Sequence, residues 1–329
     1  MLTIKTDNLP TDWNQNLLNS PFGTIFQTKE HAAYLKSRLG SNPIFLKFFD
    51  HDNLVAQLLA FNTPRINGKI TKIFGRGKIY SLLKSVNLFP RYLHWSYGPV
   101  IFDSFYKNSV FETLGNFLSS KKYSFLGSPH PLDSNSSFPS KFNFNENRNG
   151  TFIIDLKNSI EEITKNCDKR STLKNIKRSK THGVVITEIK SDDDILQYYK
   201  LQKQSRINNN LIPYSFEDIE EGLKTSKPIG GTGFLAWLGD KLTGGIIINS
   251  FNGYIVQSGS IRSELDSSEK LHSQDLLKWH IIEWGIKNKC KFYDLAGIKL
   301  TDRSSKEEGI FMHKKKWGGK LYEYSTFKN

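Results

Sequence analysis

Three consecutive lysines, Lys314, Lys315 and Lys316, stand near the end of the chain and are followed by Trp317-Gly318-Gly319. A lysine ammonium that is held in place can stabilise the negative charge that develops on oxygen during acyl transfer to an amine, and one such donor is worth about 2.7–4 kcal/mol. A lysine triplet is also typical of a solvated surface run. The residue types alone leave both interpretations of Lys314 open. If Lys314 is catalytic, substitution of Lys316 should have little effect.

A second group of basic residues covers residues 169–180, with Asp168 as the nearest acid. Four of them follow the spacing i, i+4, i+7 and i+8, which would place them on one face of a helix. These four are Arg170, Lys174, Lys177 and Arg178. Such a face can bind phosphates of an RNA or of a pyrophosphate-linked substrate. An exposed helix without a ligand is the alternative, because Leu173 and Ile176 give the segment a packed side.

Composition excludes several other kinds of protein and site. The chain has 329 residues, of which 37% are hydrophobic and 24% charged, which indicates a folded globular protein of about two domains. It lacks a phosphate-binding loop, a Gly-x-Ser-x-Gly elbow and a His-Glu-x-x-His motif. Two cysteines and eight histidines are too scattered for a disulfide framework or a metal cage. We therefore expect neither a metal nor a cofactor. The net charge of +14 favours anionic partners.

Apolar periodicity predicts the same order of elements twice, a hairpin, a strand, a helix and a strand. The first set covers residues 44–49, 54–61, 92–101, 109–121 and 123–126, and the second covers residues 234–238, 242–251, 254–261, 273–288 and 291–295. A strand at 151–156, a helix at 160–180, a strand at 184–189 and helices at 192–207 and 216–225 precede the second set.

This repeated order predicts two α/β domains with mixed sheets. A polar loop over residues 133–149 separates them, so we place the domains at 1–150 and 151–319. The β-prone tail, residues 320–329, is predicted to return to the first domain. No apolar run approaches the ~18–20 residues of a membrane span, and the first twenty residues contain no apolar signal core.

Two motifs near the end of the chain, YDLAGI at 293–298 and GIFMHKKKWGGKLYEY at 309–324, resemble the Fem aminoacyltransferases. This family builds peptidoglycan cross-bridges and consists of two GNAT-like domains. The resemblance extends upstream to Tyr97-Gly98-Pro99-Val100, to the basic segment followed by Gly183-Val184, and to a lone arginine at Arg206. Ala296 stands where the family has a strand glycine, and His313 stands where it has a phenylalanine.

The resemblance implies two tandem GNAT-like domains, in a compact form without the helical-hairpin insertion of some members, since only ~30 residues separate Tyr199 from Gly230. It implies an oxyanion-stabilising role for Lys314. The implied substrate-binding residues are Lys36, Tyr97, Arg206, Tyr254, Gln257, Asp294, His313 and Trp317. Gln257 replaces an aromatic residue of many members, and Asp103 lies one residue later than their acid. Asp103 and Asp294 are the candidates for a general base.

The segment at 260–275 indicates which kind of acyl donor the protein uses. GNAT enzymes that use coenzyme A cradle its pyrophosphate on the backbone of a glycine-rich turn between the central strand and the next helix. Here that segment reads SIRSELDSSEKLHSQD and contains no glycine. Its sequence therefore favours an aminoacyl-tRNA donor over acyl-CoA.

These observations predict a Fem-like enzyme that forms an amide between an activated aminoacyl group and an amine of an anionic, membrane-linked cell-envelope precursor. We expect such a protein in the cytoplasm, with peripheral association at the inner membrane face. A first alternative is an acyl-CoA-dependent N-acyltransferase acting on a sugar or protein amine. A second alternative, of another class, is a non-catalytic RNA-binding protein whose basic surface is its function.

Overall fold

The computed structural model describes residues 2–65, 90–133 and 136–329. The chain forms two compact units. The N-terminal unit comprises Met1–Gly150 and Tyr322–Asn329, and the C-terminal unit comprises Thr151–Leu321. Two strands, β7 (Asn145–Asp155) and β13 (Lys320–Lys328), begin in one unit and end in the other.

The N-terminal unit contains a mixed sheet in the order β1-β2-β3-β4-β6-β13, with β5 paired to β3. Its strands are β1 (Thr3–Asp7), β2 (Asn42–Asp50), β3 (Asn53–Pro64), β4 (Arg91–Trp95), β5 (Val100–Ile101) and β6 (Phe125–Gly127). The predicted hairpin is confirmed as β2 and β3. The single strand predicted at 92–101 is instead two strands, because Tyr97 has a left-handed φ of +53° and Pro99 has no N–H to donate.

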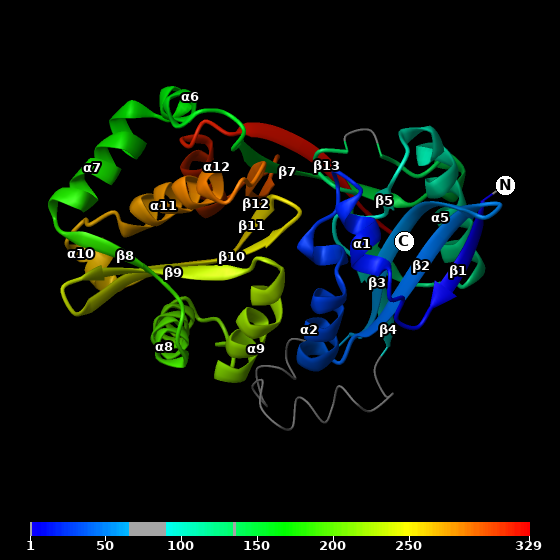
Figure 1. Cartoon of the computed structure of the whole chain (residues 1–329), viewed down its shortest axis with the longest axis horizontal. Helices are drawn as coiled ribbons and strands as arrows, with labels where there is room; N and C mark the ends of the chain where they lie inside the picture. Colours follow the sequence, from blue (N-terminus) through cyan, green and yellow to red (C-terminus); the bar gives the residue numbers. More distant parts are fainter. Residues whose placement is uncertain (1, 66–89, 134–135) are drawn as a thin grey trace. The chain divides into compact units, whose positions relative to one another are not determined.

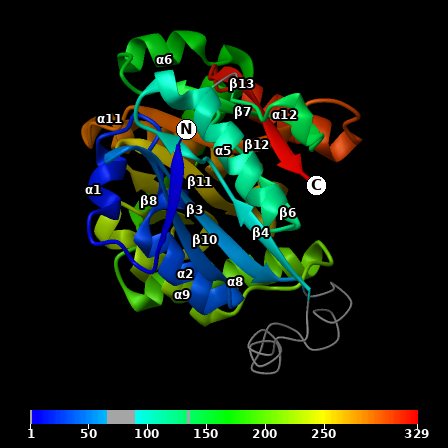
Figure 2. The same ribbon diagram turned by 90° about the vertical axis from the view of Figure 1, so that its right-hand side faces the viewer.

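Three helices of this unit are α1 (Trp13–Leu18), α2 (Lys29–Leu39) and α5 (Lys107–Ser120). Helix α5 buries Val110, Leu114 and Leu118 at its helical spacing against the sheet (Figure 2). Short 3-10 turns cover Ile25–Gln27, Ser104–Tyr106 and Ser140–Phe142. The last of these, and the beginning of β7, lie within the segment 133–149 that was predicted to be a loop, of which residues 134–135 are outside the described residues.

The C-terminal unit contains the other strands of the same mixed sheet, in the order β7-β12-β11-β10-β9-β8. The strands not yet defined are β8 (Val184–Glu188), β9 (Thr232–Leu238), β10 (Lys241–Phe251), β11 (Tyr254–Arg262) and β12 (Phe292–Lys299). Neighbours from β8 to β11 are antiparallel, whereas β11 and β12 are parallel. The register of this parallel pair covers only Tyr254–Val256 and Phe292–Asp294. The residues of β12 after Asp294 therefore do not pair with β11 and can contact the helix that follows, α12 (Ser305–Lys315).

Helices cover both faces of this sheet (Figure 1). They are α6 (Ile160–Asn166), α7 (Lys174–Thr181), α8 (Asp192–Asn208), α9 (Phe216–Ser226), α10 (Glu264–Ser268), α11 (Ser273–Lys287) and α12 (Ser305–Lys315). The core on the α7 and α11 side includes Leu277, Ile281 and Ile282, and α8 and α9 pack a second cluster on the other side. None of the helices in the described ranges is both long and apolar enough to cross a membrane.

The helix predicted over residues 160–180 is interrupted. Helix α6 ends at Asn166, Cys167 and Asp168 are extended, and a π-helical turn over Lys169–Leu173 leads into α7. The break follows from Asp168, whose carboxylate accepts a hydrogen bond from the backbone N–H of Ser171 (2.7 Å) and so begins a new helical segment. Arg170 therefore precedes α7 and does not share its regular spacing. Helices α10 and α12 were not predicted.

Candidate active site

Lys314 lies in the last turn of α12, a helix that begins at a capping box of Ser304 and Glu307. Its Nζ donates hydrogen bonds to the carbonyls of Ala296 (2.9 Å) and Gly297 (3.0 Å) in β12. An ammonium has three N–H groups, so one donor is left for a further acceptor. Burial lowers the pKa of Lys314 to about 8, and the charge of Asp294 opposes this effect. Lys314 is thus mostly cationic at neutral pH.

The backbone at Ala296 explains how one ammonium reaches two successive carbonyls. In a regular strand successive carbonyls point in opposite directions. Ala296 instead has a φ of +66°, which turns the chain so that both carbonyls face Lys314. This is the position at which the resembled motif has glycine, the residue that adopts such a φ without steric cost.

Asp294 precedes Ala296 by two residues in β12 and is fully buried. It accepts hydrogen bonds from the Tyr254 hydroxyl (2.9 Å), the backbone N–H of Ala296 (2.8 Å) and the Thr151 hydroxyl. Tyr254 is 2% exposed and Trp317 is fully buried in the core. Burial therefore argues against the predicted substrate contacts of Tyr254, Asp294 and Trp317, and against Asp294 as a general base.

A buried charged cluster on the other side of α12 was missed by the sequence analysis. We call Asp275, Lys278, His313 and Lys316 the Asp275 cluster. Lys316 Nζ lies 2.7 Å and 2.8 Å from the two carboxylate oxygens of Asp275, and Asn175 donates to Asp275 at 2.7 Å. Lys316 is therefore part of a buried ion pair, and the expectation that its substitution has little effect on the transfer rate stays a prediction. The charged residues of α11 are scattered among its apolar residues, so the sequence gave no sign that Asp275 and Lys278 lie inside the core.

Burial also lowers the pKa values of Lys278 and His313, the other two members of the Asp275 cluster. It lowers the pKa of Lys278, which is 3% exposed, to about 8, with Asp275 acting in the opposite direction. It lowers the pKa of His313 to about 3, assisted by the charges of Lys278 and Lys316. His313 is therefore neutral over the physiological range and cannot supply a cation beside Lys314.

Arg206 and Gln257 lie on other elements of the same unit. Arg206, at the end of α8, donates from Nε to the carbonyl of Ile212 (2.5 Å), and its guanidinium stacks on the ring of Tyr214 at 4.4 Å. The side chain of Arg206 forms no other hydrogen bond or ion pair within the described part of the chain. Its terminal nitrogens are thus held in an orientation that suits a carboxylate or a phosphate. Gln257 accepts a hydrogen bond from the hydroxyl of Tyr293 (2.9 Å).

Three predicted residues belong to the N-terminal unit. Lys36 is exposed on α2. Tyr97 is 6% exposed and packs on Phe26. Asp103 is exposed and accepts a hydrogen bond from the N–H of Phe105 (2.9 Å), beginning a 3-10 turn.

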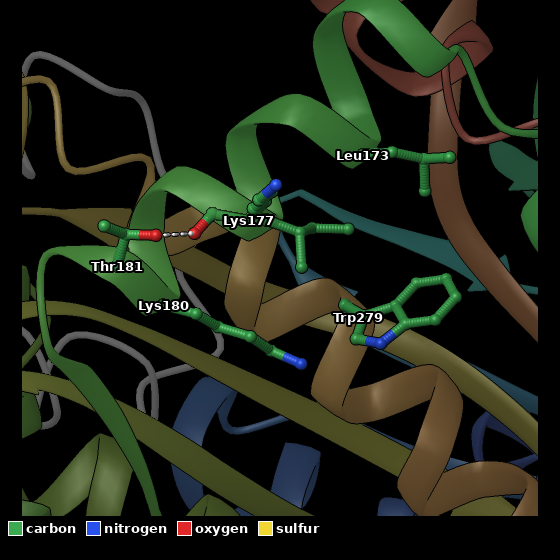
Figure 3. Close-up of a pocket in the computed structure, with 6 residues that line it drawn as sticks. Leu173, Lys177, Lys180, Thr181 and Trp279 are labelled. Carbon is green, nitrogen blue, oxygen red and sulfur yellow. Dashed lines mark hydrogen bonds between the residues drawn. The ribbon is translucent and has the colours of Figure 1, made fainter.

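An open pocket of about 480 Å³ lies between α7 and α11 (Figure 3). Its walls combine apolar groups with two lysines, and the lining residues are Leu173, Ile176, Lys177, Lys180, Thr181 and Trp279. The four predicted phosphate-binding residues, Arg170, Lys174, Lys177 and Arg178, are all exposed. None of these four forms an ion pair within the described residues. The segment therefore presents uncompensated positive charge beside the pocket.

The N-terminus of α11 is already occupied by the chain itself. The carboxylate of Asp266 accepts a hydrogen bond from the N–H of Ser273 (2.7 Å), and Asp275 lies in the same first turn. Asp266 is 5% exposed. A pyrophosphate placed at this helix end would meet two carboxylates where an anion site needs free N–H groups.

No protein-family model and no curated protein matches the chain. Among solved structures the chain is similar to FemX, with 11% sequence identity, a TM-score of 0.71 and a match that covers 98% of this chain and 96% of FemX. The chain has the fold of FemX.

Two further solved structures share this fold. L-PGS from Bacillus licheniformis matches with 12% identity and a TM-score of 0.59, over 98% of this chain and 92% of that one. A tandem GNAT protein from the clavulanic acid biosynthesis pathway matches with 9% identity and a TM-score of 0.54, over 99% of this chain and 97% of that one. These matches confirm the predicted mixed α/β fold with tandem GNAT-like architecture.

Proposed function

We propose that the protein is an aminoacyltransferase of the FemX type, which transfers an aminoacyl group from an aminoacyl-tRNA to an amine. The observation that carries this proposal is the environment of Lys314, a half-buried ammonium with two donors fixed by carbonyls and the third left over. The fold shared with FemX, and the family motifs that surround Lys314, support the same reaction.

The reaction joins the nitrogen of the acceptor amine to the carbonyl carbon of the donor ester. A C–N bond forms, the carbonyl oxygen becomes negatively charged, and the C–O bond to the ribose then breaks. The proton lost by the amine ends on the leaving ribose hydroxyl. Lys314 would donate its third N–H to the charged oxygen, an interaction that is stronger in the transition state than in the ground state.

The donor would bind through its phosphates. Arg170, Lys174, Lys177 and Arg178 provide exposed, uncompensated positive charge for an RNA backbone. The carboxylates of Asp266 and Asp275 at the start of α11 disfavour the pyrophosphate of coenzyme A. This charge distribution is why we favour the aminoacyl-tRNA donor over the acyl-CoA alternative, although the chain also shares the fold of a tandem GNAT protein.

The acceptor would be an anionic, amine-bearing precursor of the cell envelope, linked to a membrane. Arg206, whose guanidinium is oriented by Tyr214 and Ile212, suits an acidic group of this acceptor. Lys36, Tyr97 and Gln257 stay sequence-based predictions for acceptor binding, with Gln257 in place of the aromatic residue of many family members. The protein would then act in the cytoplasm, at the inner membrane face.

Calorimetry with three ligands tests the donor. We expect an aminoacylated RNA end to bind with a strong dependence on salt, uncharged RNA to bind more weakly, and acetyl-CoA to bind weakly or not at all. Tight stoichiometric binding of acetyl-CoA would instead support the acyl-CoA enzyme. Equal binding of charged and uncharged RNA, together with no transfer to any amine, would support the non-catalytic RNA-binding protein.

A further inference from the structure

Asp294 is a buried acid to which the proposed reaction assigns no step. Its carboxylate is fully buried and accepts hydrogen bonds from a phenol, a backbone N–H and the hydroxyl of Thr151. All three partners can donate, which suits the ionised carboxylate. A buried charge of this kind is costly unless an opposite charge compensates it.

A chain of hydrogen bonds connects Asp294 to Lys314 through residue 296. The Asp294 carboxylate accepts from the N–H of Ala296 (2.8 Å), two residues further along the strand. The carbonyl of Ala296 in turn accepts from Lys314 Nζ (2.9 Å). The Thr151 hydroxyl lies within hydrogen-bonding distance of both the carboxylate and this carbonyl. The hydrogen bond between the Ala296 N–H and the Asp294 carboxylate thus stabilises the left-handed turn at Ala296.

The charges of the two groups are complementary. Burial lowers the pKa of Lys314, and the negative charge of Asp294 raises it. The other charged or titratable groups of this region are the Asp275 cluster on α11 and α12. There Asp275 is paired with Lys316, while Lys278 is itself cationic. Within the described residues, Asp294 is the carboxylate that favours the protonated form of Lys314.

We infer that Asp294 is a positioning residue for Lys314, because its carboxylate fixes the turn that receives the ammonium and its buried negative charge keeps that ammonium protonated. The catalytic consequence rests on the proposed function of Lys314. The electrostatic relation between the two residues is independent of it.

The test replaces Asp294 with asparagine, which keeps the size and the oxygen that accepts from Ala296 but removes the charge. Titration of Lys314 is followed by NMR on lysine-labelled protein, with the signal assigned by its loss in Lys314→Met. In Asp294→Asn the midpoint should fall by about one pH unit, a usual size for the loss of one nearby opposite charge. The alkaline decline of the transfer rate should move by the same amount.

Asp266→Asn is the matched control. Asp266 is also a buried aspartate that accepts from a backbone N–H, that of Ser273. It contributes nothing to the pKa of Lys314, so its variant should leave both the titration and the pH profile in place. A titration of Lys314 that is unchanged in Asp294→Asn overturns the inference.

Two further measurements keep the test decisive. If the midpoint falls in Asp294→Asn while Lys314→Met retains the full rate, the inference holds and the proposed function fails. If Asp294→Asn does not fold, the double variant Asp294→Asn/Lys314→Met is compared with Lys314→Met in urea. The double variant should be the more stable, because it leaves no uncompensated buried carboxylate, and lower stability of the double variant would overturn the inference.

Discussion

Ala296 has a left-handed φ of +66° at the point where β12 presents its carbonyls to Lys314. The left-handed region costs an L-residue with a side chain roughly 1–2 kcal/mol relative to its preferred conformations. The chain therefore stores strain at the residue that positions the candidate catalytic lysine. The hydrogen bond from the Ala296 N–H to the Asp294 carboxylate offsets part of that strain.

Ala296→Gly should therefore stabilise the protein. Glycine removes the steric penalty, while its greater freedom in the unfolded chain subtracts about 0.4–1 kcal/mol, so the net gain in the free energy of unfolding is up to about 1.6 kcal/mol. Ala236→Gly is the control, because Ala236 is a fully buried residue of β9 without a left-handed φ. Urea denaturation should show a gain at 296 and a loss at 236. A loss at both positions would show that no strain is stored at Ala296.

The effect of Lys278 on the free energy of unfolding depends on pH. Its pKa is lowered by burial from 10.5 to about 8, so between these values the unfolded chain binds more protons than the folded one. The contribution of Lys278 to stability is therefore unfavourable below pH 8 and becomes less so as the pH rises towards 10.5.

Lys278→Met should remove this dependence. The variant should be more stable than the parent near neutral pH, and the difference should shrink with rising pH by up to about 1.4 kcal/mol per unit. Urea denaturation of both proteins at about pH 7.5 and about pH 9.5 measures the difference. Comparison at equal pH cancels the opposite effect of Cys167, whose pKa burial raises to about 11. A difference that stays constant between the two pH values would show that burial does not lower the pKa of Lys278.

At the scale of secondary-structure elements, the end of α12 is fixed by the segment that joins α6 to α7. The carbonyl of Lys316 accepts from the N–H of Asp168 (2.8 Å) and from the hydroxyl of Thr172 (3.1 Å). The side chain of Lys316 pairs with Asp275 on α11. The segment that joins α6 to α7, together with α11, thus holds the turn that follows Lys314, and the break in the predicted helix at Asp168 is part of this arrangement.

Lys316→Met should consequently destabilise the protein by about 3 kcal/mol, because removal of one partner of a buried ion pair leaves the other charge uncompensated. The side chains of Lys316 and Asp275 are only 14% and 5% exposed. Lys315 is exposed on the same helix, and Lys315→Met should change stability by less than about 0.5 kcal/mol. Adding Asp275→Leu to Lys316→Met should recover part of the loss. Chemical denaturation that finds the two lysine variants equal would contradict this role of Lys316.

At the scale of the whole molecule, the periodicity of apolar residues was enough to predict most elements. The hairpin of β9 and β10, the strand β11 and the helix α11 all occur where the spacing places them. These elements have clear periods because one face of each packs on a core. The repeated order of elements likewise predicted the tandem fold that the chain shares with FemX.

The contacts of the site that join residues far apart in the chain could not be predicted from the sequence. The pairing of Lys316 with Asp275 joins residues 41 positions apart, and no local pattern marks it. The positive φ of Ala296 carries a sequence signal only through the glycine of the resembled motif. Tyr254, Asp294 and Trp317 have polar groups typical of a binding site, yet all three lie in the core, Tyr254 and Asp294 on strands and Trp317 in the turn between α12 and β13.

The net charge of +14 and the exposed basic residues of α7 predict that this helix contributes to RNA binding. Lys174→Gln and Lys177→Gln should each weaken binding of an aminoacylated RNA end and reduce the slope of its salt dependence by about 0.7. Lys287→Gln is the control, since Lys287 is exposed in the last turn of α11. Fluorescence titrations at several salt concentrations give the slopes. Equal slopes in all three variants would mean that α7 does not contact the RNA.

The rate of a single turnover with Lys314→Met measures whether Lys314 stabilises the transition state. Because the third donor of Lys314 would act on charge that develops only in the transition state, we expect the rate of aminoacyl transfer to fall by about 10²–10³ while RNA binding is nearly unchanged. Lys315→Met should retain the parent rate. If Lys314→Met also keeps the parent rate, or if both variants weaken RNA binding equally without affecting transfer, Lys314 belongs to a phosphate-attracting surface and the catalytic role is contradicted.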